Sequence, residues 1–372
     1  MTKELQERMN EFLNTLQNSN RSFLIGAGCS KCANLPLTGQ LADMVKAKLP
    51  TGKTKDIIEY VITNFTASID TTIEEFISEI VDYAAILERR GEKGSTNPTI
   101  ELNGVNYTEK ELKTAVIEIQ TNIVEAIEKN DFELKHHNSF INAIHNRLDN
   151  GKNMYITPTN YFVLNYDTLI EDALSMNKIS YADGFRGGAI GWWDNSVFDD
   201  ENIKARLFKL HGSLDWCISK DDIMPRRLKG KSKHPNYNFE NNVLIYPCET
   251  KYKETQNDPF AQLLQHYRDK LRNSDKAVLT ICGYRFADTH INVEIEIALS
   301  EGRNLTIVIF TEANTPNDYP ILKKWFENKN YKPNILFFTK KGYYHDDQII
   351  EAATGTDLDW WKFEKLTELL NN

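Results

Sequence analysis

Hydrophobic and polar positions divide the chain into three stretches. Apolar residues recur at helical spacing over residues 2–18, and a short apolar run at Ser22–Ile25 then leads into a second helical pattern at Leu35–Leu49. Over residues 51–150 the sequence is charged and helix-forming, with almost no strand signal. After this stretch, short apolar runs alternate with helical patterns. The pattern therefore predicts a strand-helix unit, an inserted helical subdomain and a longer α/β region.

Six apolar runs predict strands in the last region. They are Tyr161–Leu164, Leu207–Leu210, Val243–Tyr246, Ala277–Cys282, Leu305–Phe310 and Ile335–Thr339. Continuous apolar runs are typical of strands buried on both faces, as in a parallel sheet that helices cover. We therefore expect a doubly wound, mainly parallel α/β sheet that starts in residues 1–50 and continues in residues 151–372, with residues 51–150 as the insertion. In such sheets the ligand lies at the carboxyl ends of the strands.

Composition narrows the classes of protein but does not give a function. The chain of 372 residues can bury a large core, and its five cysteines are an odd number, so a small disulfide scaffold is excluded. No apolar run approaches the roughly 20 residues of a membrane span, and the charged first residues do not resemble a signal peptide. We expect a cytoplasmic protein. A net charge of −9 disfavours nonspecific binding of a polyanion over the whole surface.

The first candidate site is the turn Gly26-Ala27-Gly28, which follows a predicted strand and precedes Cys29 and Ser30. Backbone amides at the amino end of a helix can hold phosphate, and small residues allow a ligand to approach. The third glycine of the usual dinucleotide motif is missing. A tight strand-to-helix turn with no ligand explains the same residues.

Polar residues follow three further predicted strands. Asn165 and Asp167 come after Tyr161–Leu164, and Asp167 is placed to cap the next helix, whereas Asn165 would project into the ligand crevice. His211 ends the run Leu207–Leu210, although a lone histidine is more often structural. Gly283 ends the run Ala277–Cys282, and Asp288 could cap the helix that follows. All of these residues would meet at one edge of the sheet.

Taken together, these segments resemble the sirtuin-like superfamily, and specifically the bacterial sirtuin-like NAD-hydrolysing proteins of antiphage defence. The resemblance spans roughly residues 22–310 and consists of four stretches in the order of the family. They are Gly26-Ala27-Gly28-Cys29-Ser30 with Leu35-Pro36-Leu37, Asn165-Tyr166-Asp167 with Leu169 and Glu171, Lys209-Leu210-His211-Gly212-Ser213-Leu214-Asp215-Trp216, and Gly283-Tyr284-Arg285-Phe286-Ala287-Asp288 with His290-Ile291-Asn292.

The resemblance implies a Rossmann-like sheet and a role for each matched residue. Asn165 and His211 match the catalytic pair of the family, with Asp167 beside them at the nicotinamide end. The residues that would line the phosphates and ribose of NAD are Gly26, Ala27, Gly28 and Ser30, and those on the adenosine side are Gly283 and Tyr284. One departure is that Val163 and Leu164 stand where the family usually carries threonines.

The resemblance leaves three kinds of function open. Sirtuin deacylases carry a structural zinc module of four cysteines, whereas this chain offers only Cys217 and Cys248 in that interval, with His234 nearby. We therefore expect no zinc and no other metal, and NAD hydrolysis to nicotinamide and ADP-ribose rather than deacylation, with NAD as substrate. A scaffold or sensor that binds NAD or ADP-ribose without turnover is the alternative. A redox role for Cys29-x-x-Cys32 is a further, less favoured possibility.

Partners are implied by the resemblance alone. Proteins of this kind often form large homo-oligomers with a HerA-type hexameric ATPase and DNA translocase. A basic stretch at Arg226, Arg227, Lys229, Lys231 and Lys233 could touch nucleic acid, although such a run with Gly230 and Ser232 is more often a solvated loop.

Overall fold

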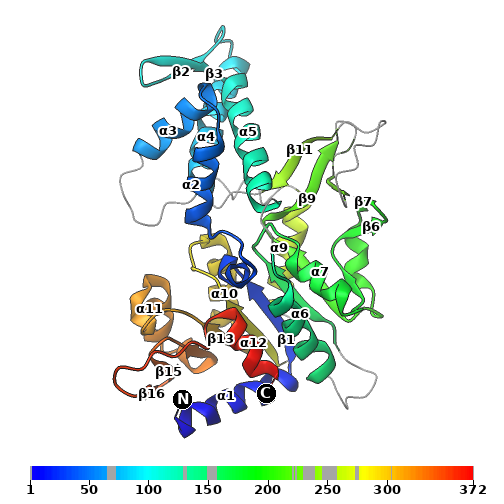
Figure 1. Cartoon of the computed structure of the whole chain (residues 1–372), viewed down its shortest axis with the longest axis vertical. Coiled ribbons are helices and arrows are strands. Elements are labelled where there is room, and N and C mark those ends of the chain that lie inside the picture. The colour runs from blue at the N-terminus through cyan, green and yellow to red at the C-terminus, as the bar shows by residue number, and fades with distance from the viewer. Residues whose placement is uncertain are drawn as a thin grey trace.

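The computed structural model describes residues 2–64, 73–128, 132–148, 157–219, 222, 224–228, 239–244, 258–272, 276–302 and 304–371 (Figure 1). The helices are α1 (Lys3–Gln17), α2 (Thr38–Lys48), α3 (Lys53–Asn64), α4 (Ile73–Glu92), α5 (Glu109–Glu128), α6 (Lys135–Asn142), α7 (Leu169–Met176), α9 (Phe260–Arg272), α10 (Thr289–Ser300), α11 (Pro320–Glu327) and α12 (Phe363–Asn371). A short 3₁₀ helix, η1 (Ala27–Ala33), follows the first strand.

The strands form one large sheet and two smaller ones. They are β1 (Asn20–Ile25), β2 (Thr99–Leu102), β3 (Val105–Thr108), β4 (Thr159–Val163), β5 (Tyr181–Ala182), β6 (Phe185–Gly187), β7 (Ile190–Trp193), β8 (Ala205–Lys209), β9 (Gly212–Ser219), β10 (Arg226–Leu228), β11 (Phe239–Leu244), β12 (Ala277–Cys282), β13 (Leu305–Phe310), β14 (Ile335–Phe338), β15 (Gly342–His345) and β16 (Gln348–Glu351).

The central sheet confirms the predicted α/β fold. Within the described residues its nine strands lie in the order β16-β15-β14-β13-β12-β1-β4-β8-β5, and the pairs β14–β15 and β15–β16 are antiparallel while the other pairs are parallel. From β1 the chain builds the sheet outward through β4 and β8, and then returns to the other side of β1 with β12. Strand order therefore reverses at β1, which is where a doubly wound sheet opens a ligand crevice.

Both faces of the sheet are buried, as the continuous apolar runs predicted. On one face, Leu24, Phe162 and Ile281 pack in a core that includes residues of α9, α10 and α11. On the other face, Phe23 and Tyr161 pack in a second core with residues of α1, α6, α7 and α12. Alternate residues of each strand thus point into opposite cores. Side chains of these strands are therefore accessible to a ligand only where the strands end.

A third core holds the helices that precede β4. Apolar residues of α2, α3, α4 and α5 pack with one another and with Tyr166 and Leu169, which lie directly after β4. Figure 1 shows α3, α4 and α5 projecting away from the central sheet. Helix α6 lies within residues 51–150, the expected helical insertion, but packs on the central sheet. The domain boundaries expected from the sequence stay a prediction. No helix in the described ranges is long and apolar enough to cross a membrane.

The expectation of almost no strand in residues 51–150 was wrong at one place. Strands β2 and β3 form an antiparallel hairpin whose two turn residues are Asn103 and Gly104. Both have positive φ, 48° and 77°, which is the conformation that Asn-Gly favours in a two-residue hairpin. The sequence therefore contained the signal for this hairpin, between two runs in which apolar and polar residues alternate.

A second sheet was also missed. Strands β11, β9, β10, β7 and β6 form an antiparallel sheet, so the predicted strand at Val243–Tyr246 does not belong to the parallel sheet. Residues 245 and 246 of that run lie outside the described residues. Trp193 and Trp216 from this sheet join the core beside α9. The aromatic residues of these short strands do not recur at a regular spacing, so the sequence did not predict the strands.

Candidate active site

The register of the central sheet brings the predicted site residues to one edge. Ile25 of β1 pairs with Cys282 of β12 and with Val163 of β4, and Val163 pairs with Lys209 of β8. These four residues form one row across adjacent parallel strands. Asn165 and His211 each lie two residues beyond that row, after the ends of the neighbouring strands β4 and β8. The sheet therefore brings both residues to the same edge, where the sequence predicted them, and their catalytic roles stay a prediction.

The glycine turn after β1 is packed directly against the end of β12. A Cβ atom at Gly26 would lie 2.4 Å from the carbonyl oxygen of Gly283, and one at Gly28 would lie 2.8 Å from the Gly283 Cα. The Gly26 and Gly28 amides donate to the carbonyls of Cys282 and Gly283, at 3.0 and 2.9 Å. Both amides are thus used within the fold. The close packing supports the tight-turn explanation, and the phosphate-binding role of Gly26, Ala27 and Gly28 stays a prediction.

Replacing Gly283 with alanine is expected to destabilise the protein by about 3 kcal/mol, because two costs add. Its φ of +65° is the left-handed region that alanine rarely adopts, and a new Cβ would lie 2.4 Å from the Cys29 backbone nitrogen. Urea denaturation would measure the change. Gly302 is the matched control, since its φ is +62° with nothing within 4 Å of a new Cβ, so Gly302→Ala should cost only about 1–2 kcal/mol. Equal losses in both variants would contradict the packing argument.

Asn165 is fixed by its amide nitrogen, whereas its amide oxygen has no partner. The Nδ2 group donates to the carbonyl of Gly26 at 3.1 Å and to Ser30 Oγ at 2.7 Å. Ser30 in turn donates to Asp167 Oδ2 at 2.7 Å. The buried Oδ1 of Asn165 accepts no hydrogen bond from any described residue. A buried acceptor without a partner is uncommon, and in a strand-end crevice it marks a place for a ligand or a water.

Asp167 holds the start of helix α7, as predicted. Its Oδ1 accepts from the amide of Leu169 at 3.2 Å, while its other carboxylate oxygen accepts from Ser30. The same aspartate thus connects the turn after β1 to the helix after β4. The N-cap residue of α7 is Thr168, so Asp167 holds the helix start from one residue before the cap position, and a contact with nicotinamide stays a prediction.

Lys209 and Glu171 form a buried ion pair that the sequence analysis did not single out as a site. The Lys209 side chain is 1% exposed, lies 3.3 Å from Glu171 Oε1, and donates to the carbonyl of Asp167. Burial raises the pKa of Glu171 to about 7, against the lowering effect of the Lys209 charge. Lys209 therefore anchors the backbone of the segment that carries Asn165, from the adjacent strand.

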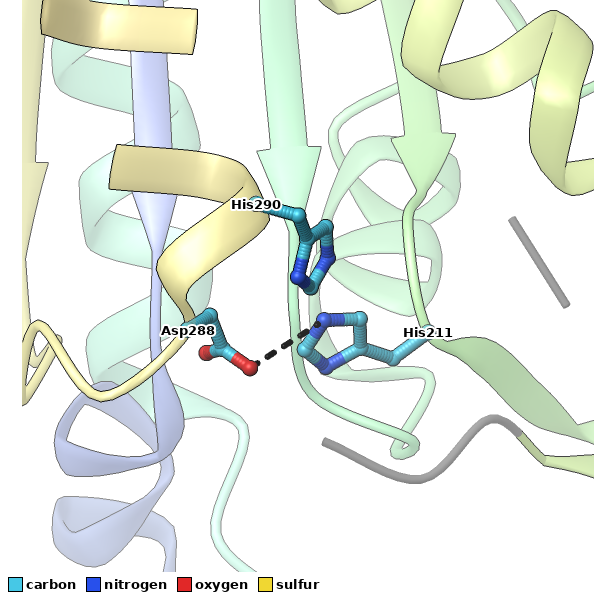
Figure 2. A group of neighbouring side chains, drawn as sticks. All are labelled: His211, Asp288 and His290. Atoms are coloured by element: carbon cyan, nitrogen blue, oxygen red, sulfur yellow. Dashed lines mark ion pairs between the residues drawn. The ribbon is translucent and has the colours of Figure 1, made fainter. Parts of the chain in front are cut away.

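His211 faces two polar residues from the start of helix α10. Figure 2 shows His211 beside Asp288 and His290, and its Nε2 lies 3.8 Å from Asp288 Oδ1. The two imidazole rings are 5.8 Å apart between centroids. Asp288 occupies the N-cap position of α10, but its side chain makes no capping hydrogen bond. The expected capping by Asp288 is therefore wrong, because its carboxylate is directed to the histidine.

Tyr284 organises the loop between β12 and α10. Its hydroxyl lies 3.1 Å from Asn292 Oδ1, to which it donates, and accepts from the Asp288 amide at 3.2 Å. Asn292 also donates to the carbonyl of Phe286 at 2.8 Å. Burial raises the pKa of Tyr284 well above its usual value, so the phenol stays a neutral donor. These contacts hold Asp288 in place, and the adenosine-side role of Gly283 and Tyr284 stays a prediction.

The cysteines near the site are poor candidates for redox chemistry. Cys29 and Cys282 are buried, and burial raises the pKa of Cys29 well above its usual value and that of Cys32 to about 12. A thiol that stays protonated is a weak nucleophile and a weak metal ligand. Burial also raises the pKa of Cys217 to about 12, whereas Cys248 and His234 lie outside the described residues.

Comparison with known proteins relates one part of the chain to a family. No curated protein matches the chain. The family match begins at β4 and includes Asn165, His211 and Gly283. The turn at residues 26–30 is outside the matched sequence. It follows β1, which lies between β4 and β12 in the sheet. Residues 159–333 match the SIR2-like domain, and this similarity supports the resemblance of the chain to the sirtuin-like superfamily.

Proposed function

We propose that this protein is an NAD glycohydrolase, which cleaves the bond between nicotinamide and ribose to release nicotinamide and ADP-ribose. The observation that carries the proposal is that Asn165 and His211 each lie two residues beyond the paired ends of neighbouring strands, with the Asn165 Oδ1 buried and without a described partner. The match to the SIR2-like domain supports chemistry on NAD.

The chemistry requires a base and a fixed sugar. As the C1′–N bond breaks, its electron pair passes to the nicotinamide nitrogen, which loses its positive charge, and the ribose gains oxocarbenium character. Water then adds to C1′ and gives up a proton. His211 would accept that proton, because it is a nitrogen base at the strand edge and Asp288 lies beside its ring to stabilise the imidazolium. Asp288 is thus a positioning residue.

Asn165 would orient the reactants. Its Nδ2 is held by Gly26 and Ser30, so rotation of the amide is restricted and the position of Oδ1 is set before any ligand binds. An acceptor fixed in this way can take a hydrogen bond from a ribose hydroxyl or from the attacking water. Holding the reacting groups in line reduces the entropy cost of reaching the transition state.

The proposed biological role follows from the family resemblance. NAD depletion would act in antiphage defence in the cytoplasm, and the protein would work as a homo-oligomer under the control of a HerA-type ATPase. Deacylation is disfavoured because the chain carries only Cys217 and Cys248 in the interval where sirtuin deacylases carry four zinc-binding cysteines. Of the basic stretch, Lys229, Lys231 and Lys233 lie outside the described residues, and a nucleic-acid contact there stays a prediction.

The test is release of nicotinamide and ADP-ribose from NAD by the purified chain, alone and with the ATPase partner. Asn165→Ala is expected to lower kcat by about 10²–10³-fold, the usual effect of removing one group that orients or stabilises a transition state. Asn160→Ala is the matched control, since Asn160 is a buried asparagine near the amino end of β4, the strand that precedes Asn165. Its kcat per folded molecule should stay at the wild-type level.

Three outcomes would contradict the proposal or one of its parts. Binding of ADP-ribose with no nicotinamide release under any partner condition would favour the scaffold or sensor function. Formation of acyl-ADP-ribose from an acylated peptide would favour a deacylase. Full activity in Asn165→Ala would remove the role assigned to the asparagine.

A further inference from the structure

Three side chains of the kinds that can bind a metal lie close together beyond the end of β8. His211, Asp288 and His290 each offer one ligand atom, and these atoms all lie within 4.8 Å of one another (Figure 2). His211 comes from the end of β8, whereas the other two come from the start of α10. Elements that are far apart in the sequence therefore converge on one small volume.

The donor set and its spacing fit a small divalent ion. Two imidazoles and one carboxylate are the ligands that zinc takes at sites with an open fourth position. Ligand atoms about 2.0–2.1 Å from a tetrahedral ion lie roughly 3.4 Å from each other. The separation of 3.8 Å between His211 Nε2 and Asp288 Oδ1 is close to that value. Small side-chain rotations would complete the geometry.

The surroundings hold the ligands in place before an ion arrives. His211 and Asp288 are 4% and 9% exposed, and His290 is half-buried, so two of the three side chains are largely shielded from water. The Asp288 backbone is fixed by Tyr284, and Tyr284 is in turn bonded to Asn292. The Asp288 carboxylate is not used as a helix cap. Such support by neighbouring groups is what orients metal ligands in proteins.

We propose that His211, Asp288 and His290 bind one divalent transition-metal ion, for which zinc is the best fit, and that the ion keeps the enzyme inactive. The inhibitory part rests on the proposed function. A metal ion takes the lone pair of an imidazole nitrogen, so a bound His211 cannot accept a proton from water. Removal of the ion would restore the base.

Metal binding is tested without reference to activity. The full chain is stripped with a chelator and titrated with Co²⁺, whose visible absorption reports its ligands, and Zn²⁺ binding is then measured by calorimetry. We expect one ion per chain. His290→Ala and Asp288→Asn should each weaken binding at least about tenfold, because each removes one of three ligands. His136→Ala removes a histidine of helix α6 and should bind as the wild type does.

Activity then tests the inhibitory part. Zn²⁺ should suppress nicotinamide release by the stripped wild type and by His136→Ala, whereas the rate of His290→Ala, whatever its basal value, should change far less. Unfolding midpoints of all variants exclude misfolding as the cause.

The outcomes separate the two proposals. Equal binding of Co²⁺ by wild type and His290→Ala would overturn the metal site. Binding with an unchanged rate of NAD hydrolysis would overturn its inhibitory role. Binding at this site in a protein that never releases nicotinamide would uphold the metal site and reject the glycohydrolase.

Discussion

Replacing His211 with alanine is expected to lower kcat for nicotinamide release by about 10²–10⁴-fold, the range for loss of a positioned general base. His211 lies two residues beyond the carboxyl end of β8, as Asn165 does beyond the neighbouring β4, and its Nε2 lies 3.8 Å from the Asp288 carboxylate. Without the imidazole, water at C1′ must lose its proton to solvent. KM should change less than kcat, because NAD is bound mainly through its other parts.

Steady-state kinetics on chelator-treated protein would measure this effect, so that bound metal does not obscure it. His211→Gln serves as a second variant, because it preserves most of the side-chain volume but cannot act as a base near neutral pH. His136→Ala should retain wild-type kcat. If either His211 variant keeps full activity while its unfolding midpoint is unchanged, His211 is not the base.

Lys209→Met is expected to destabilise the fold by about 3–5 kcal/mol at pH 8, the cost of breaking a buried ion pair. At that pH Glu171 is ionised in the wild type, and Lys209 is 3.3 Å from it. The substitution leaves Glu171 buried with no lysine beside it, and it also removes the hydrogen bond to the Asp167 carbonyl. Because that carbonyl lies two residues from Asn165, we also expect activity to fall.

The pH dependence of this effect has a definite sign. The pKa of Glu171 is raised to about 7 in the folded protein, so its protonated form adds stability at low pH that is lost as pH rises toward 7. In Lys209→Met the pKa rises further, so the loss continues to higher pH. The destabilisation should therefore be smaller at pH 5 than at pH 8.

Urea denaturation at both pH values would measure it. Lys204→Met is the matched control, since Lys204 is exposed and directly precedes the same strand, and its change should stay within about 0.5 kcal/mol. A destabilisation of Lys209→Met that is equal at pH 5 and pH 8 would show that the pair with Glu171 does not cause it.

The sequence predicted the parts of the site that depend on strand ends. A buried parallel strand has a continuous apolar run, and the polar residue after it must lie at the ligand edge, which located Asn165, Asp167 and His211. Two of the predicted runs, Ala277–Cys282 and Leu305–Phe310, coincide with β12 and β13. These strands and their ends could be predicted because a continuous apolar run indicates directly which residues are buried.

The missed residues depend on the direction of a side chain, which periodicity does not report. Lys209 sits inside an apolar run and could have been noticed as a charged residue where burial was expected. Asp288 was expected to cap a helix, because the signals for a helix start are local in sequence. They cannot show that the carboxylate faces a histidine from a distant strand. The antiparallel sheet was missed for a similar reason, since its pairing joins short segments that have no regular pattern.

The central position of β1 has a consequence for synthesis on the ribosome. The first strand to be made lies between β4 and β12, so both of its edges stay unpaired until much later parts of the chain exist. Ser30 and Asn165, which bond to each other, are 135 residues apart, and Gly283 packs on the same turn. At about 5–20 residues per second, most of the chain is made before this site can close. Truncated chains that end before β12 would therefore lack a closed site.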